Sequence, residues 1–221
     1  MKKCYTRKQR ALRRLALAVL LLAALNLLGV VNSLPAQAAR DAAAEVNLTK
    51  PQVIYRYHSD ALPIYRFAVQ ELIEGENGIV LCSLEFHPLL GWGVWDRCAA
   101  AIRRGETMAL GWRYHGQGEA ESARLFGRVD DERIARIVLR WRPGTGIEDD
   151  FRYWEMPEEA FFRLDGRRYV LCDALAVGSA EINANGADHR FLSELTALGY
   201  DAAGTLLAET TVDSIWWYTP E

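Results

Sequence analysis

The chain has 221 residues, of which 50% are hydrophobic, 10% aromatic and 25% charged, a composition typical of a globular protein and not of a disordered, collagen-like or coiled-coil one. The net charge of −3 is unevenly distributed, because residues 1–38 hold seven basic and no acidic residues. Residues 39–221 hold 19 basic and 29 acidic residues, a net charge of −10 that repels nucleic-acid phosphates. We therefore expect no nucleic-acid partner.

Residues 1–38 are predicted to be a signal peptide. Basic residues up to Arg14 precede an apolar run from Leu15 to Val31, and Ala36-Gln37-Ala38 forms an A-x-A cleavage pattern. The run of 17 residues also reaches the lower limit for crossing a bilayer, about 17–25 residues, so an uncleaved anchor is the alternative. The protein is then secreted or at the cell surface or, if uncleaved, anchored through residues 15–31 with its domain outside, since the basic residues stay in the cytoplasm.

Residues 39–51 are small and polar and are expected to form a linker, and residues 52–221 are expected to form a β-rich extracytoplasmic domain. Apolar residues recur at every second position in four segments, which predicts β-strands at 64–70, 79–86, 107–115 and 134–141. Weaker strand patterns cover 52–57, 92–97, 123–129, 160–164, 167–173, 191–199 and 205–212. Short helices are expected only at 95–103 and 119–125.

Turn signals separate these segments. Asn77-Gly78 and Asp165-Gly166 are dipeptides typical of hairpins, and residues 201–204 are expected to join the last two strands. Alternation on one side of each strand predicts antiparallel sheets with one wet face. The sequence thus predicts a mainly β fold, an antiparallel β-sandwich or barrel-like sheets, after an N-terminal signal or anchor helix.

Three cysteines follow the signal: Cys82, Cys98 and Cys172. Export permits disulfides, and Cys82 and Cys172 each end a strand-like Val-Leu-Cys segment, so a Cys82–Cys172 bridge is one of three pairings. The alternative is three buried thiols. The absence of C-x-x-C from the sequence excludes a thioredoxin-type redox site and a zinc ribbon.

Three segments carry a resemblance to a known group of proteins. They are the run from Phe126 to Ile134 with the following strand to Trp141, the closing segment from Ala197 to Leu207, and the pair Gly91-Trp92. Together they resemble small exported proteins of uncharacterised function in Gram-positive bacteria. The resemblance implies a β-rich extracytoplasmic domain and supplies no catalytic residues.

Motifs for catalysis and metal binding are scarce in the sequence. It contains no G-x-S-x-G, and the predicted domain and linker hold one lysine, Lys50. We expect no cofactor, because the histidines stand far apart and form no metal motif. The alternative is Ca²⁺ at residues 181–188, where oxygen ligands alternate from Glu181 to Asp188, although Leu192 stands where an EF-hand carries its bidentate glutamate.

Two groups of side chains are candidates for function. One is a set of acidic residues that fits a carboxylate hydrolase or, alternatively, a solvated loop: Glu148, Asp149, Asp150, Glu155, Glu158 and Glu159. The other is Trp216, Trp217 and Tyr218, an aromatic strip for a sugar or a partner or, alternatively, a core strand. The sequence favours a non-catalytic binding or envelope-associated module that contacts an envelope protein or polymer. The alternatives are a small extracytoplasmic hydrolase and a membrane-anchored accessory subunit.

Overall fold

The computed structural model describes residues 6–27, 34–57, 68–87, 91–117, 120–141, 151–174 and 195–213. These residues form twelve strands in three four-stranded sheets, with two α-helices and one short 3-10 helix. Every pairing between named strands is antiparallel. The mainly β, antiparallel prediction is therefore confirmed, and among the described strands no sheet closes into a barrel.

The sheets follow the chain closely. Sheet A has the order β1 (Gln52–Tyr57), β2 (Ala68–Glu74), β3 (Gly78–His87) and β4 (Gly91–Ala101). Sheet B has the order β5 (Met108–Gln117), β6 (Ala120–Val129), β10 (Arg167–Ala174) and β9 (Phe161–Leu164). Sheet C has the order β12 (Leu206–Thr211), β11 (Thr196–Tyr200), β7 (Arg136–Trp141) and β8 (Arg152–Glu155), and η1 (Glu158–Ala160) precedes β9.

The turns form where the sequence predicts them. Asn77-Gly78 lies between β2 and β3, and Gly75 N donates to Gly78 O across this turn at 2.9 Å. Asp165 and Gly166 join β9 to β10 with φ values of 50° and 78°, the left-handed conformation of a tight hairpin turn. Residues 201–204 join β11 to β12, and the carboxylate of Asp201 accepts from the backbone of this turn.

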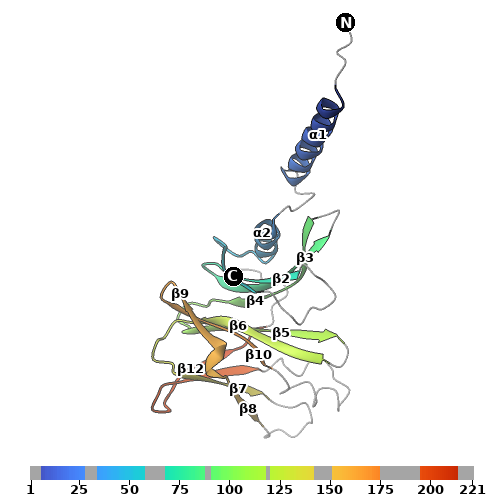
Figure 1. The fold of residues 1–221 in the computed structure, drawn as a ribbon. Coiled ribbons are helices and arrows are strands. Elements are labelled where there is room, and N and C mark those ends of the chain that lie inside the picture. The colour runs from blue at the N-terminus through green and yellow to red at the C-terminus, as the bar shows by residue number, and fades with distance from the viewer. Residues whose placement is uncertain are drawn as a thin grey trace.

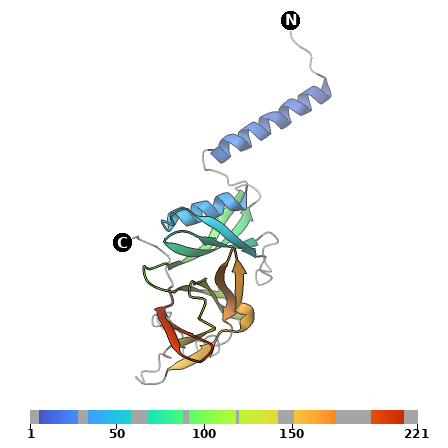
Figure 2. The ribbon, with the colours of Figure 1, turned by 90° about the vertical axis from the view of Figure 1, so that its left-hand side faces the viewer.

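Helix α2 (Pro35–Glu45) and the three sheets stack as successive layers (Figure 1). One apolar core lies between α2 and sheet A, and Figure 2 shows α2 lying across that sheet. A second core joins Leu72, Ile79 and Leu81 of sheet A to Phe126 and Tyr169 of sheet B. The third and largest core fills the space between sheets B and C. Both faces of sheets A and B are therefore covered.

Two predictions of helix are wrong. Residues 95–103 lie largely in β4 and residues 119–125 lie largely in β6. Strand β4 sits between two apolar cores, since Ala99 packs towards α2 while Cys98 and Ala100 pack towards sheet B. A strand that is buried on both faces has a continuous apolar run in place of a two-residue period. Periodicity alone cannot distinguish such a run from a short buried helix.

The prediction of a linker at 39–51 is also wrong for the described chain. Residues 35–45 form α2, and the segment after it is held to the β2–β3 turn, because Asn77 Nδ2 donates to Asn47 O at 3.1 Å and Thr49 N donates to Asn77 Oδ1 at 2.8 Å. An alanine-rich segment with proline in its first turn has high helix propensity. Small residues therefore indicated a packed helix here and not a flexible connection.

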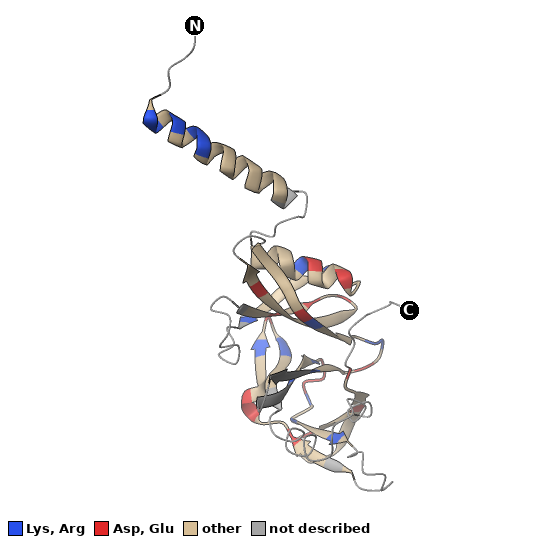
Figure 3. Ribbon diagram, turned by 90° about the vertical axis from the view of Figure 1, so that its right-hand side faces the viewer, with Lys and Arg blue, Asp and Glu red and all other residues tan. Residues whose placement is uncertain are grey.

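Helix α1 (Arg7–Leu27) stands apart from the layers in Figure 1. Its large apolar side chains are exposed, with Leu15, Leu17 and Leu20 each more than 60% accessible. Figure 3 colours the lysine and arginine positions blue, and on this helix they gather towards its N-terminal end. Within the described ranges, none of the helices is both long and apolar enough to cross a membrane.

Candidate functional site

The predicted cysteine bridge is absent, because Cys82, Cys98 and Cys172 form no disulfide with one another. Cys82 faces the core beneath α2, and its thiol donates to Glu71 O at 3.6 Å. Cys172 packs against the core between sheets B and C. The two side chains therefore lie in different cores, separated by sheets A and B, and the predicted Cys82–Cys172 pairing is wrong in this fold. Burial raises the pKa of the Cys82 thiol to about 12.

Most of the other predicted site residues lie outside the described chain, and the rest lie on the surface. Three of the predicted groups lie outside the described residues: the aromatic strip of Trp216, Trp217 and Tyr218, the 181–188 loop, and the acidic residues Glu148, Asp149 and Asp150. Glu155 pairs with Arg136 at 3.3 Å on the surface, and Glu158 and Glu159 are exposed in η1. No metal-binding group of three or more histidine, cysteine or acidic residues occurs in the ranges that are described.

The structure instead brings together six buried or half-buried polar residues between sheets A and B, which we call the polar seam: Gln70, Ser83, Glu85, Asp96, Arg113 and Arg124. They come from β2, β3, β4, β5 and β6. Arg113 and Arg124 are register partners in the β5–β6 hairpin, and Gln70 and Ser83 are partners across β2 and β3. Alternation places each pair on the face that meets the opposite sheet.

Hydrogen bonds and one ion pair link five of the six members of the polar seam in a chain across the two sheets. Arg113 Nη1 donates to Ser83 Oγ at 2.8 Å, and Gln70 Nε2 donates to the same oxygen at 3.1 Å. Arg124 donates to Gln70 Oε1, and the other end of the Arg113 guanidinium forms an ion pair with Asp96. The seam thus continues the A/B interface with polar contacts beyond the point where its apolar core ends.

The electrostatics of the seam depend on burial. Arg113 is 1% exposed, and burial lowers its pKa while the adjacent Asp96 carboxylate opposes that effect. A guanidinium stays charged under all ordinary conditions, so the pair is ionic. Glu85 is also buried, and its Oε2 atom has no hydrogen-bond partner among the described residues. His87 Nε2 lies 3.7 Å from this oxygen.

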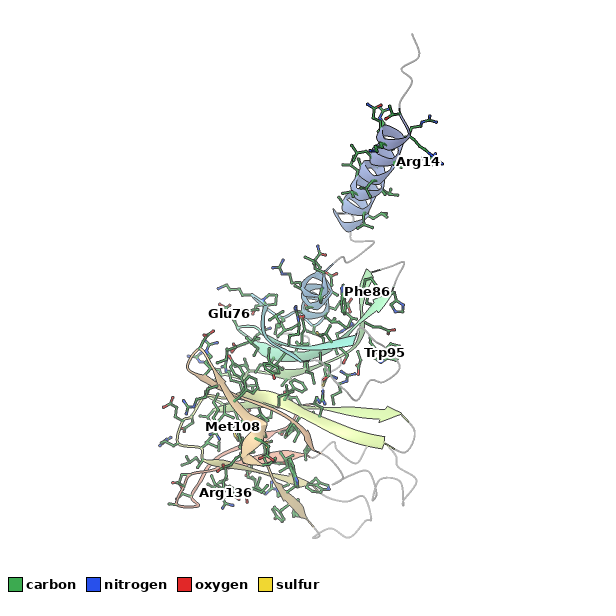
Figure 4. All side chains as sticks on the ribbon, in the orientation of Figure 1. Arg14, Glu76, Phe86, Trp95, Met108 and Arg136 are labelled. Atoms are coloured by element: carbon green, nitrogen blue, oxygen red, sulfur yellow. The ribbon has the colours of Figure 1, made fainter. Side chains whose placement is uncertain are left out.

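Three aromatic side chains near the connection of β3 to β4 form a group that we call the aromatic rim: Phe86, Trp92 and Trp95. Trp92 packs against the core beneath α2, whereas the other two are exposed. Phe86 follows Glu85 and Trp95 precedes Asp96 in the chain, and the Phe86 and Trp92 rings pack with centroids 5.6 Å apart. Phe86 is 38% and Trp95 53% exposed. Figure 4 shows Phe86 and Trp95 on the same side of the body, away from Glu76 at the other end of β3.

A β-bulge explains the exposure of Trp95. The pairing of β3 with β4 shifts from Ser83 with Asp96 to Leu84 with Val94, so Trp95 is the extra residue on β4. A bulge interrupts the alternation of side chains and turns one of them away from the packed faces. This is why the spacing of the sequence did not identify Trp95 as a surface residue.

Two further polar clusters hold the layers together. Tyr169 Oη donates to Glu74 Oε2 at 2.8 Å, and Arg128 and Arg167 also pair with this carboxylate. Burial alone raises the pKa of Glu74, but the hydrogen bonds from Arg128 and Tyr169 outweigh it and lower the pKa. Asp213 accepts from Ala101 N at 2.9 Å and thereby ties the end of the described chain to sheet A.

The comparisons with known proteins gave no match: none of the protein-family models, none of the curated proteins and none of the solved structures is similar to this chain. The resemblance to small exported proteins of Gram-positive bacteria therefore stays a prediction from the sequence motifs.

Proposed function

We propose that the protein is a non-catalytic extracytoplasmic binding module of the cell envelope, and that its aromatic rim contacts an envelope polysaccharide. The observation that carries this proposal is the exposed indole of Trp95, which precedes Asp96 on β4, where the Asp96–Arg113 ion pair holds the strand to sheet B. An indole offers a flat apolar face for a sugar ring, and a rigid backing holds that face in place.

The size of the rim favours a sugar over a protein. A stable protein interface covers about 800 Å² on each partner, with several buried anchors. On the β3–β4 hairpin, the exposed large apolar side chains of the described part are Phe86 and Trp95. Two aromatic side chains are enough to stack on one or two sugar rings. The net charge of −10 on residues 39–221 further disfavours a polymer with a dense run of phosphate charges.

The contacts of the polar seam support binding rather than catalysis. Asp96 is paired with Arg113, and Glu85 is 5% exposed, so both carboxylates serve the packing between sheets. Acid–base hydrolysis of a glycan needs two carboxylates that reach the substrate from opposite sides. The proposal also takes residues 1–38 as an export segment, and the three stacked cores favour the sandwich form of the predicted fold.

A sedimentation assay tests the proposal. We would mix the full chain in mild detergent with purified, insoluble peptidoglycan sacculi and measure the fraction that pellets. Loss of one aromatic stack worth about 1 kcal/mol weakens binding about fivefold, so Trp95→Ala is expected to pellet at correspondingly higher sacculus concentration. The matched control is Tyr153→Ala, because Tyr153 is 60% exposed on β8, outside the rim.

Two results would overturn the assignment of a glycan. One is equal pelleting of the wild type and Trp95→Ala, with Tyr153→Ala unchanged. The other is a single protein cross-linked to the rim in intact cells with no binding to sacculi, which would make the partner a protein.

A further inference from the structure

The predicted cleavage motif lies inside a folded helix. Ala36, Gln37 and Ala38 occupy the first turn of α2, which begins at Pro35 after Leu34. Leu34 has an extended backbone, and the Gln37 side chain accepts from Leu34 N at 3.2 Å while Gln37 N donates to Leu34 O at 3.0 Å. Gln37, the central residue of the motif, therefore helps to cap the N-terminus of α2.

The bond that would be cut is buried. Ala38, Ala39, Ala42 and Ala43 are each 0% exposed and form one face of α2, with the spacing of an amphipathic helix. They pack on the core that includes side chains of β2 and β3. Glu45 forms an ion pair with Arg97 of β4, which ties the C-terminal end of α2 to sheet A.

Cleavage after Ala38 would damage this layer. It would remove Pro35–Ala38 and leave seven residues of the helix, fewer than an isolated helix needs. It would also create a charged α-amino group at Ala39, which is fully buried. A buried unpaired charge is costly, and a positive charge at a helix N-terminus opposes the helix dipole.

We propose that the A-x-A site at 36–38 is not cut and that the apolar run from Leu15 to Val31 remains as a permanent membrane anchor. The described helix ends at Leu27, but the run in the sequence has 17 residues and so reaches the lower length limit for crossing a bilayer. The bilayer then covers the leucine side chains that α1 leaves exposed, and the basic residues at its N-terminal end stay on the cytoplasmic side. The domain begins at Leu34, three residues beyond the apolar run, so its α2 end lies next to the membrane. This inference rests on the proposed extracytoplasmic placement and is independent of the glycan ligand.

The test is the intact mass of the full chain with a C-terminal tag, purified from the membranes of expressing bacteria after alkaline carbonate extraction. We expect the tagged chain in the membrane pellet with residues 1–38 attached. A soluble chain that starts at Ala39 would overturn the inference. Protease added to spheroplasts reports separately on placement: degradation of the domain from outside is expected, and full protection would refute the proposed function as well as the anchor's orientation.

A pair of variants tests the physical reason. Ala42→Asp puts a charge into the buried face of α2, whereas Ala44→Asp changes an exposed position of the same helix. If packing of α2 protects the site, Ala42→Asp is expected to yield a several-fold larger fraction of chain starting at Ala39, and Ala44→Asp is expected to stay intact. Equal and complete cleavage in both variants and in the wild type would show that processing ignores α2.

Discussion

The ion pair of Arg113 with Asp96 gives a quantitative test of the polar seam. In Arg113→Met the new side chain fills much of the same volume but cannot donate to Asp96 or Ser83. Arg113 is 1% exposed and the Asp96 side chain 17%, so water replaces the lost donors poorly. Breaking a buried pair by removing one partner typically costs about 3–5 kcal/mol, a large part of the 5–15 kcal/mol by which domains are usually stable.

Urea unfolding followed by tryptophan fluorescence measures this cost. We expect Arg113→Met to lower the free energy of unfolding by about 3–5 kcal/mol with an unchanged dependence on urea concentration. Adding Asp96→Asn to the same chain removes the stranded charge and is expected to restore about half of the loss. The surface control is Arg136→Met, whose partner Glu155 lies 3.3 Å away and is 57% exposed, with an expected cost below about 1 kcal/mol.

The reasoning is refuted if Arg113→Met and Arg136→Met cost the same, within about 0.5 kcal/mol. It is also refuted if Asp96→Asn destabilises the Arg113→Met chain further, because the carboxylate would then have partners other than the arginine.

Three other predictions follow from single positions. Hydrogen bonds hold the pKa of Glu74 below its ordinary 4.5 although burial, the largest influence, acts to raise it. The carboxylate thus stabilises the fold above about pH 4.5, and this stability is lost as the pH falls through the folded pKa. Glu74→Gln should accordingly be destabilised at pH 7 and approach the wild type as the pH is lowered below 4.5 in urea unfolding, and a pH-independent difference would contradict this. Burial raises the pKa of Cys82 to about 12, so iodoacetamide at pH 8 should label it only after unfolding; rapid labelling of the native chain, seen by mass spectrometry, would argue against burial. A Cβ on Gly127 would lie 2.2 Å from the Ala109 carbonyl oxygen, so Gly127→Ala is expected to cost about 1–3 kcal/mol, whereas Gly93→Ala meets nothing within 4 Å and serves as the control in thermal unfolding. Equal midpoints for these two variants would contradict the close approach of β5 and β6.

Local patterns in the sequence were sufficient for most of the strands and for the turns, although β8 was not predicted. The two-residue period at 79–86, 107–115 and 134–141 predicted β3, β5 and β7, because alternation is a direct consequence of strand geometry. Asp165-Gly166 predicted the β9–β10 hairpin, since a tight turn needs residues that accept a positive φ. Such features depend only on neighbours in the chain.

The candidate site depended on contacts that no local pattern reveals. Ser83 and Glu85 alternate with apolar residues, a pattern typical of a strand with one wet face. In the fold, sheet B covers that face and turns it into a buried polar seam. The sequence did not predict the exposure of Trp95, because that exposure results from a β-bulge. It also did not show that two sheets separate Cys82 from Cys172.

By itself the sequence determined the mainly β, antiparallel class, most strand positions and the hairpin turns, because these follow from side-chain alternation and backbone preference. Only the tertiary structure decided which strand faces are dry, that residues 35–45 form a layer and not a linker, and that Arg113 and Asp96 meet. The reason is that burial is a property of the whole arrangement: a polar side chain that water satisfies on an open sheet needs a specific partner once a second sheet packs against it.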